Sequence, residues 1–275
     1  MSSHVPSGRR RRRLTSAGTP SLKSRHACGY SQVPLHFNRR GRFPHRQELP
    51  VTTLGFIGTG KVGAALARLA VGAGHDVVLA NRRGPATLQD LVEELGPRAR
   101  AATVPEAARA GEIVVVAVPL TSYPELPVEA LRGKVVIDTS NHKPGEHTGH
   151  LPAVDQGLTT PYEVMQHHLP QSFVVKAFSN MFFRHLAALA RPAGAADRSA
   201  LPVAGDDPSA RARVGELLNT LGYDPLDAGP LVESRRFAAF GTPANQAYLD
   251  PEGLFAAPGR PAPATRVAEL LRRVP

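Results

Sequence analysis

Three glycines at positions 58, 60 and 63 form the pattern in this chain whose chemistry is clearest. A Gly-x-Gly-x-x-Gly spacing after an apolar run is typical of a strand-to-helix turn that holds a pyrophosphate, because free backbone N–H groups and the helix dipole point at the anion. Gly58 permits the tight turn, Gly60 lets the backbone approach the phosphates, and Gly63 lets the helix pack close to the strand. The cofactor-binding residues predicted here are Gly58, Thr59, Gly60, Lys61, Val62 and Gly63.

The residues after the next apolar run indicate which dinucleotide this turn would bind. An NAD site usually has Asp or Glu there, about 20 residues past the glycines, to hold the ribose 2′-hydroxyl. This chain has Asn81, Arg82 and Arg83 instead. A guanidinium group can donate two parallel hydrogen bonds to phosphate oxygens, and no carboxylate is present to bind the hydroxyl. The sequence therefore predicts NADP(H) in preference to NAD(H), with these three residues among those that bind it.

A strand before the turn and a helix after it must position these groups. Residues 54–57 are an apolar run, and apolar side chains recur at helical spacing from Val62 to Ala73. Gly74 stands where this helix would end, and residues 75–80 are typical of a second buried strand. This strand–helix–strand context strengthens the glycine pattern, which is a weak signal alone.

The alternation of strands and helices continues and predicts an α/β fold, a doubly wound parallel sheet covered on both faces. Continuous apolar runs are typical of parallel strands buried on both sides. Further strands are expected at residues 99–104, 112–119, 133–138 and 173–178, and helices at residues 87–95 and 105–110. We expect the strand at 173–178 to be the last of the main sheet.

Polar or turn-forming residues follow three of these strands. Ligands of parallel sheets bind outside the carboxyl ends of the strands, so these residues should line the nicotinamide side of a dinucleotide. Pro119 cannot continue a ladder and should turn the chain out over the cofactor. The cofactor-binding residues predicted here are Ala117, Val118, Pro119, Ser140 and Asn141. Ser179 and Asn180 are our candidates for positioning the rings, although these residue types also serve turns and caps.

The residues after 180 predict a smaller second unit. Helices are expected at residues 182–190, 206–221 and 230–240, with short strands at 201–205 and 223–227. The predicted organisation is a basic leader (1–50), a dinucleotide-binding domain (51–180), a small C-terminal α/β lobe (181–240) and a Pro- and Gly-rich tail (241–275) with a weak helix at 265–273.

The leader carries the excess positive charge. The chain has 275 residues, with 33 Lys and Arg, 23 acidic residues and a net charge of +10. Residues 1–50 hold 11 of the basic residues and one of the acidic residues, so residues 51–275 are neutral. We expect the leader to be disordered. Residues 9–13 could form a nucleic-acid or targeting patch, the composition fits an organelle transit peptide, and a true start at Val51 is a further hypothesis.

The cysteine and histidine content limits which disulfides and metal sites this chain could form. Cys28 is the only cysteine, so no intrachain disulfide or cysteine-based metal cluster can form, which fits a reducing, cytoplasmic setting. Residues 142–170 include His142, His147 and His150, but no acid or cysteine is placed to complete a metal site. We predict no metal and expect this segment to close over a second ligand. No apolar run approaches the length of a membrane span.

Several stretches together resemble the F-420:NADP oxidoreductases, a family of NADPH-dependent reductases of the deazaflavin coenzyme F-420. The matching stretches are Gly58-Thr59-Gly60, Asn81-Arg82-Arg83-Gly84-Pro85 with Thr87-Leu88, Ala117-Val118-Pro119, Asp138-Thr139, Val175-Lys176-Ala177-Phe178-Ser179-Asn180, Gly205-Asp206-Asp207, Leu221-Gly222-Tyr223 and Asp227-Ala228-Gly229-Pro230-Leu231. The resemblance covers about residues 52–240. The leader, His142-Lys143 and the tail from Gly241 lie outside its pattern.

The resemblance implies a Rossmann domain with a small C-terminal domain, often in a dimer. It implies that the 2′-phosphate of NADP(H) lies near Thr59 and residues 81–83, and that the deazaflavin lies at the strand ends after Val118, Asp138 and Phe178. Direct hydride transfer between two rings depends on orientation and exclusion of water, with little side-chain acid–base chemistry. We therefore name no general acid or base.

Two other functions stay open at this point. An NADPH-dependent reductase of a small imine or carbonyl, similar to pyrroline-carboxylate reductases, would need a proton donor. His142, Lys176 or Tyr223 could serve, and their spacing selects none of them. The third hypothesis is a non-catalytic NADPH-binding sensor that the leader recruits to nucleic acid. The absence of net charge in residues 51–275 argues against this hypothesis. We expect a small-molecule or deazaflavin partner, a homodimer, no membrane, and no nucleic acid except through the leader.

Overall fold

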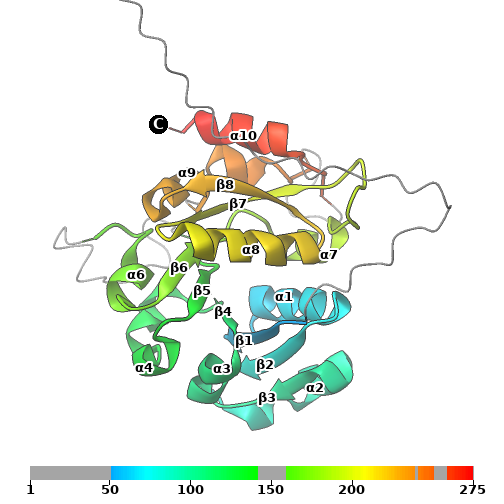
Figure 1. Cartoon of the computed structure of the whole chain (residues 1–275). Coiled ribbons are helices and arrows are strands. Elements are labelled where there is room, and N and C mark those ends of the chain that lie inside the picture. The colour runs from blue at the N-terminus through cyan, green and yellow to red at the C-terminus, as the bar shows by residue number, and fades with distance from the viewer. Residues whose placement is uncertain (1–50, 142–158, 239–240, 251–258, 275) are drawn as a thin grey trace, which may run out of the picture. The chain divides into compact units, whose positions relative to one another are not determined.

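One eight-stranded sheet organises residues 51–141, 159–238, 241–250 and 259–274, the residues that this computed structural model describes (Figure 1). Its strands are β1 (Thr53–Ile57), β2 (Asp76–Ala80), β3 (Ala99–Ala101), β4 (Ile113–Val116), β5 (Val135–Asp138), β6 (Phe173–Lys176), β7 (Ala200–Gly205) and β8 (Asp224–Gly229). They lie in the order β3-β2-β1-β4-β5-β6-β7-β8, and each neighbouring pair is parallel except β6 and β7. The predicted α/β fold is confirmed.

The strand order reverses between β1 and β4. The chain leaves β1 for β2 and β3 on one side, and then returns to build β4, β5 and β6 on the other. The loops after β1 and β4 therefore diverge at the carboxyl edge, which is where dinucleotides bind in such sheets. Pairing of Phe56 with Val115 and of Ile57 with Val116 sets the register at this point.

Helices cover both faces of the sheet (Figure 1). One core cluster includes Val115 and Ile137 together with side chains of α1 (Lys61–Gly72) and α8 (Pro208–Thr220). The alternate strand residues Val114 and Val136 belong to a second cluster with α3 (Val104–Ala110), α4 (Val128–Leu131) and α6 (Val164–His168). Strands that are buried on both sides explain the continuous apolar runs of the sequence.

The other helical segments are short. They are η1 (Pro85–Leu88), α2 (Gln89–Leu95), η2 (Gly96–Arg98), η3 (Leu120–Glu125), α7 (Phe183–Ala188), η4 (Leu231–Ser234), α9 (Arg235–Ala238), η5 (Pro243–Gln246) and α10 (Ala264–Arg272), where η marks a 3₁₀ helix. Within the described ranges, no helix combines the length and the apolar character that crossing a membrane requires.

The sheet continues beyond β6, so the prediction that this strand is the last was wrong. β7 pairs antiparallel with β6 through Val175↔Gly205 and Lys176↔Ala204, and β8 continues parallel to β7. The strands expected in a separate lobe thus extend the main sheet. A free edge at β6 would leave N–H and C=O groups unpaired, and a strand pattern alone does not reveal which edge a strand joins. The division into domains 51–180 and 181–240 stays a prediction.

The described part of the predicted tail packs into the body. Tyr248 is fully buried, and α10 buries Val267 and Leu271. The Ala200 N–H donates to the Ala262 carbonyl at 2.8 Å, which fastens this segment to β7. In Figure 1, β7 and β8 lie between α8 and α10. Composition missed this packing, because Pro and Gly indicate turns whereas a few apolar side chains decide burial.

Element boundaries differ from the prediction by a few residues. The strand expected at 99–104 ends at Ala101, because Thr103 and Glu106 form a capping box that begins α3. The helix expected at 87–95 begins earlier, as the 3₁₀ turn η1. The expectations for residues 1–50, including Cys28, and for the histidines at 142, 147 and 150 concern positions outside the described residues.

Candidate functional site

The glycine turn between β1 and α1 has the conformation that its sequence predicts. Gly58 has a φ of +100°, and a Cβ atom there would lie 2.4 Å from the Ala117 carbonyl oxygen at the end of β4. A Cβ atom on Gly63 would lie 2.0 Å from the Gly58 carbonyl oxygen, so α1 packs against the turn itself. Neither position has room for a side chain, and only glycine adopts the Gly58 conformation without strain.

The first turn of α1 offers backbone donors. Gly60 is the N-cap residue, no side chain caps it in the described part of the chain, and the first turn contains no acid. A Cβ atom on Gly60 would meet no other atom within 4 Å, so the space in front of the helix is open. The first N–H groups of a helix have no intrahelical acceptor, and the dipole makes this end positive. These features fit the pyrophosphate of a dinucleotide.

The loop after β2 presents two arginines to solvent. The Asn81 side chain folds this loop: its Oδ1 accepts from the Arg83 N–H at 2.8 Å, and its Nδ2 lies 3.0 Å from Thr87 Oγ1 and 3.4 Å from Thr59 Oγ1. The loop is thereby held next to the glycine turn. Arg82 and Arg83 are exposed and form no ion pair with any described residue. Unpaired guanidinium groups fit a 2′-phosphate.

A cleft of about 700 Å³ joins the turn and the arginine loop. Nine predicted cofactor residues line it: Gly58, Thr59, Gly60, Asn81, Arg82, Arg83, Ala117, Val118 and Pro119. Its other lining residues were not predicted: Ile57, Val104, Thr121, Ser122, Glu125 and Leu126. Half of these belong to η3 and Leu126 directly follows it; Pro119, the N-cap of η3, was the one signal in the sequence for that wall. The volume lies in the ordinary range for cofactor sites.

The other predicted cofactor residues lie beside this lining. Lys61 is exposed at the start of α1, Val62 is half-buried, and Gly63 is buried under the turn. Ser140 is half-buried and Asn141 is exposed; both follow β5 at the same edge of the sheet. Binding of the cofactor by these five residues stays a prediction.

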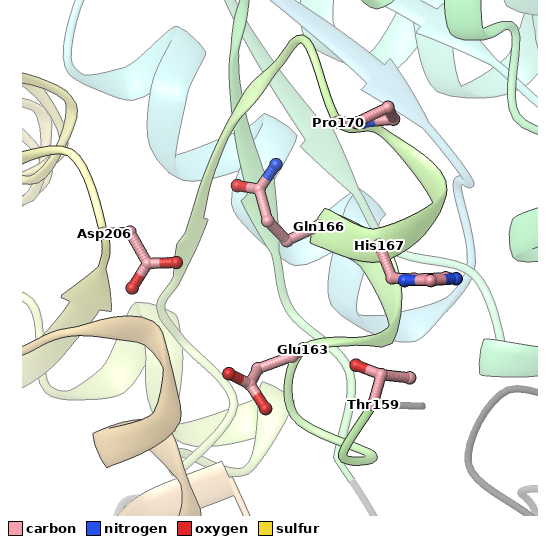
Figure 2. A pocket seen from close by; sticks show the side chains of 6 residues that line it. All are labelled: Thr159, Glu163, Gln166, His167, Pro170 and Asp206. Atoms are coloured by element: carbon pink, nitrogen blue, oxygen red, sulfur yellow. The ribbon is translucent and has the colours of Figure 1, made fainter. Parts of the chain in front are cut away.

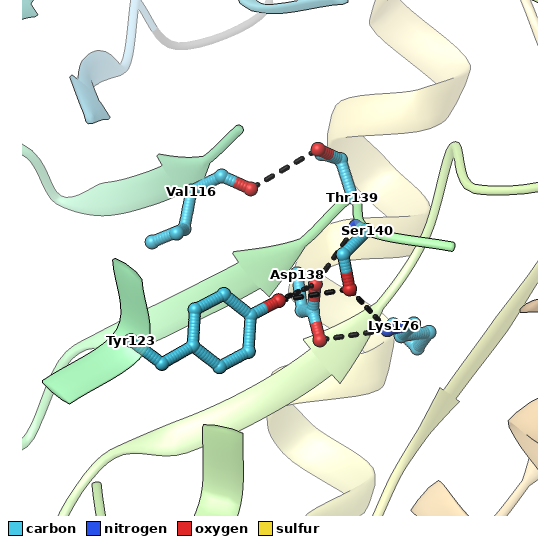
Figure 3. Close-up of polar contacts among 6 residues, drawn as sticks. All are labelled: Val116, Tyr123, Asp138, Thr139, Ser140 and Lys176. Atoms are coloured by element: carbon cyan, nitrogen blue, oxygen red, sulfur yellow. Dashed lines mark hydrogen bonds and ion pairs between the residues drawn. The ribbon is translucent and has the colours of Figure 1, made fainter. Parts of the chain in front are cut away.

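Four side chains form a polar network where β5 and β6 end (Figure 3). Asp138 and Lys176 are register partners, and Lys176 Nζ donates to Asp138 Oδ2 at 2.7 Å. Tyr123 of η3 donates to Asp138 Oδ1 at 2.7 Å, and its hydroxyl lies 2.8 Å from Ser140 Oγ. Lys176 Nζ also donates to Ser140 Oγ at 2.9 Å, and the Ser140 N–H donates to Asp138 Oδ1 at 2.8 Å. The Lys176 and Asp138 side chains are 1% and 2% exposed.

Tyr123 is the neutral bridge of this network. Burial, and then the Asp138 carboxylate, raise the pKa of Tyr123 well above its ordinary value, so its hydroxyl stays protonated. Lys176 and Ser140 are predicted from the sequence in separate roles, whereas Tyr123 is not predicted. No sequence signal marks that residue, because only the path of η3 brings it to the end of β5.

Ser179 and Asn180, the predicted ring-positioning residues, lie in the interior. The two residues are 3% and 2% exposed, and they follow Phe178, which has a φ of +63°. Asn180 Nδ2 donates to the Tyr248 hydroxyl at 3.0 Å, which links this turn to the C-terminal segment. Ser179 Oγ and Asn180 Oδ1 have no hydrogen-bond partner among the described residues. Neither residue lines the cleft, and their role in positioning rings stays a prediction.

Of the proton donors considered for an imine or carbonyl reductase, Lys176 is the one that the structure places at this edge. The Tyr223 hydroxyl is buried and donates to the Leu186 carbonyl of α7, and burial raises the pKa of Tyr223. The Tyr223 hydroxyl proton is therefore engaged in a hydrogen bond inside the core. His142 is outside the described residues.

A second hollow, of about 340 Å³, lies beside α6 (Figure 2). Its lining residues are Thr159, Glu163, Gln166, His167, Pro170 and Asp206. Both of its carboxylates support local structure, since Glu163 accepts from the Thr160 hydroxyl at 2.5 Å and Asp206 accepts from the Leu231 N–H at 2.9 Å. No group of three or more metal-ligating side chains occurs here or elsewhere in the described part of the chain. None of the predicted site residues lies in this hollow.

Known proteins share this architecture. Residues 53–142 match the family model of the NADP oxidoreductases described as coenzyme F-420-dependent. The hypothetical protein SMa0349 from Sinorhizobium meliloti is 29% identical, with a TM-score of 0.58 over 70% of this chain and 91% of that chain. A protein from Arthrobacter sp. FB24, provisionally assigned as an F-420-dependent NADP reductase, is 27% identical, with a TM-score of 0.55 over 68% and 88%.

The matched residues contain the glycine turn, the arginine loop and the strand end at Ala117, which are the parts that line the cleft. The part of the chain that builds the cleft therefore matches the family model of the NADP oxidoreductases. The resemblance predicted from the sequence, to the F-420-dependent NADP oxidoreductases, is confirmed over residues 53–142.

Proposed function

We propose that this protein transfers a hydride between NADPH and a second ring cofactor, the deazaflavin coenzyme F-420. The observation that carries the proposal is the cleft that joins the open N-terminus of α1 to Arg82 and Arg83, which form no ion pair with any described residue. The family match over residues 53–142 and the provisional assignment of the Arthrobacter protein support this choice of acceptor.

The residues of the cleft bind and orient in this proposal. The first turn of α1 holds the pyrophosphate, and Arg82 and Arg83 hold the 2′-phosphate. Asn81 keeps the arginine loop against the glycine turn. When bound, NADPH supplies the hydride. The wall formed by η3 excludes water from the cleft, and orientation of the two rings then accounts for much of the rate.

The test is turnover of the full chain with coenzyme F-420. The deazaflavin absorbs visible light when oxidised, so its reduction by NADPH is followed as a loss of absorbance. We expect turnover with NADPH and at least about 100-fold less kcat/KM with NADH, because NADH lacks the phosphate that the two arginines bind. NADPH binding without reduction of the deazaflavin would contradict this acceptor and leave the dinucleotide site standing.

A second candidate is an NADPH-dependent reductase of a small imine or carbonyl. The observation in its favour is Lys176, a buried ammonium group that donates to the Ser140 hydroxyl at the carboxyl edge of the sheet. The same assay with a cyclic imine or an aldehyde in place of the deazaflavin separates the two reductases. Binding of NADPH with no turnover of any of these acceptors would favour the sensor hypothesis.

We also propose that the protein is a cytoplasmic homodimer, as the family resemblance and the cysteine content suggest. Size-exclusion chromatography with light scattering measures the mass in solution. A mass of one chain of 29.3 kDa at micromolar concentration would contradict the dimer.

A further inference from the structure

Hydride addition to a C=N, a C=O or a conjugated ring leaves a second atom that must gain a proton. We propose that the network of Tyr123, Asp138, Ser140 and Lys176 supplies this proton, with the Ser140 hydroxyl as donor and the Lys176 ammonium as the source behind it. The inference rests on the proposed function and deepens it. It assigns the acceptor to a chemical class: a neutral ring, imine or carbonyl whose nitrogen or oxygen becomes basic as the hydride arrives.

The donor and acceptor types in the network decide which atom holds which proton. Ionised Asp138 only accepts, so the Tyr123 proton belongs to the 2.7 Å bond with Asp138 Oδ1. Lys176 only donates, so it gives one N–H to Asp138 Oδ2 and one to Ser140 Oγ. The Ser140 proton is left to point either at Tyr123, 2.8 Å away, or outward. A bound acceptor can therefore redirect this proton without breaking the ion pair.

Ser140 connects the buried pair of Asp138 and Lys176 to the edge of the sheet (Figure 3). The pair is almost fully buried, whereas Ser140 is half-buried. The intervening Thr139 is tied to β4, because its N–H and its hydroxyl both donate to the Val116 carbonyl, at 3.2 and 3.1 Å. Ala117, which directly follows β4, lines the cleft. Ser140 is thus held one strand away from the cleft wall.

A purely structural role accounts poorly for this network. Burial of two charges costs free energy of desolvation, and apolar side chains of similar size often stabilise a protein as well or better. The strands around the pair are otherwise apolar, since Val136, Ile137, Val174 and Val175 are all buried. A proton relay, in contrast, requires a protonated nitrogen in contact with a hydroxyl that reaches the edge.

The step balances in atoms and electrons. As the acceptor gains a hydride from the dinucleotide (two electrons and one proton), the Ser140 O–H bond breaks and its proton bonds to the nitrogen or oxygen of the acceptor. One N–H bond of Lys176 breaks in the same step, and that proton restores the Ser140 hydroxyl. Lys176 ends as a neutral amine beside ionised Asp138. It regains a proton from water through Ser140 after the product leaves.

The change in charge favours this arrangement. The network gains one negative charge in the step that gives the oxidised dinucleotide one additional positive charge. Opposite charges that develop together at a site shielded from water stabilise each other. Before the step both partners lack these charges, so the attraction lowers the barrier without tightening the initial complex.

The first test compares Ser140→Ala with the unaltered full chain in oxidation of NADPH by coenzyme F-420 or a cyclic imine, in H₂O and in D₂O. We expect kcat to fall about 100-fold and the solvent isotope effect to increase, because proton delivery becomes limiting. The Tm should fall slightly, because Lys176 loses one acceptor, and the Kd for NADPH should rise far less than kcat falls. Ser209→Ala, at an exposed serine of α8, is the matched control. A merely structural role would lower Tm and leave the isotope effect unaltered.

The second test needs no acceptor. Lys176→Gln gives the network one negative charge, and Asp138→Asn gives it one positive charge. At pH 8 we expect the ratio of NADP⁺ affinity to NADPH affinity to rise about tenfold in the first variant and to fall by a similar factor in the second. Fluorescence titration measures both constants. Loss of stability alone would not move this ratio in opposite directions.

The outcomes separate the relay from the proposed function. Opposite shifts of the affinity ratio without turnover of any acceptor would refute the proposed function and support the network's place beside the nicotinamide. Turnover by the unaltered chain, with kcat and the isotope effect unchanged in Ser140→Ala, would overturn the relay. An affinity ratio equal in both charge variants would also overturn it.

Discussion

Two regions of the sheet's carboxyl edge differ in how their polar groups are satisfied: an open end beside β1 and β2, and a closed end beside β5 and β6. Beside β1 and β2, Arg82 and Arg83 are exposed and have no ion partner among the described residues, and the first turn of α1 has no side-chain cap. Beside β5 and β6, Lys176 and Asp138 are buried, and their bonds are made within the protein. The open end retains capacity to bind an anion, whereas the charged groups of the closed end already have hydrogen-bond partners.

The difference indicates a division of roles. Exposed cations without an ion partner are hydrated and cost the protein little free energy, and they gain charge-assisted hydrogen bonds when a phosphate binds. A buried ion pair, in contrast, is stable only if every hydrogen bond is formed in advance. We infer that binding energy comes from the open end, and that the closed end supplies groups that are preorganised before a ligand enters.

The largest expected effect tests whether Lys176 and Asp138 neutralise each other's charge in the closed end. Lys176→Met leaves Asp138 buried without its cation, and we expect the free energy of unfolding to fall by about 3–5 kcal/mol. Adding Asp138→Asn removes the remaining charge and should restore most of this loss. Urea unfolding measures both variants.

The exposed pair of Arg132 and Glu129 provides the control, because Arg132→Met should cost less than about 1 kcal/mol. If the double variant is as unstable as the single one, the pair does not act as a neutral unit and the contrast between the two ends weakens.

The glycine turn offers a test within the open end. Gly63→Ala would place a Cβ atom 2.0 Å from the Gly58 carbonyl oxygen, so we expect a loss of about 3 kcal/mol in unfolding free energy. Gly60→Ala meets no atom within 4 Å and should leave Tm unchanged. It should still weaken NADPH binding about tenfold, because its methyl group stands where the phosphates approach.

Thermal unfolding and a fluorescence titration with NADPH give both results. Equal loss of stability in the two variants would show that the space before α1 is not open, and unchanged NADPH affinity in Gly60→Ala would place the pyrophosphate elsewhere.

The arginine loop is tested by a change of cofactor preference. Replacing Arg82 and Arg83 with Ala together should raise the Kd for NADPH about 100-fold, equivalent to about 2.7 kcal/mol, and leave the Kd for NADH unchanged. Arg213→Ala, at an exposed arginine of α8, controls for loss of positive charge. A parallel loss of NADH affinity would mean that the two arginines bind a part that both dinucleotides share.

The smallest expected effect concerns pH and sharpens the description of the closed end. The pKa values of Tyr123, Tyr223 and Tyr248 are raised by burial, so the unfolded chain loses these protons at lower pH than the folded protein does. Their contribution is complete below about pH 10 and decreases above it, by up to about 1.4 kcal/mol per pH unit for each tyrosine.

Tyr123→Phe removes one titrating group, and the decline in stability above pH 10 should become shallower by that amount. Urea unfolding between pH 8 and pH 11 measures the slope. An unchanged slope would mean that Tyr123 ionises as readily in the folded protein as in the unfolded chain.

Much of the open end could be predicted from the sequence, because its parts are local. Gly58, Gly60 and Gly63 act through the backbone of one turn, and Asn81 to Arg83 follow the neighbouring strand by a few residues. Such features depend on the conformation of short segments, which residue type strongly restricts. The cleft accordingly contains nine of the predicted cofactor residues, and its unpredicted wall is the part that a 3₁₀ helix brings from β4.

Tertiary structure alone decided the closed end and the limits of the sheet. Tyr123 and Lys176 are 15 and 38 residues from Asp138 in the chain, and they meet only because β5 and β6 pair in one register and η3 folds back over their ends. The antiparallel pairing of β7 with β6 has the same origin. Apolar patterns predict that a strand is buried, but its partner and register depend on the packing of the whole sheet.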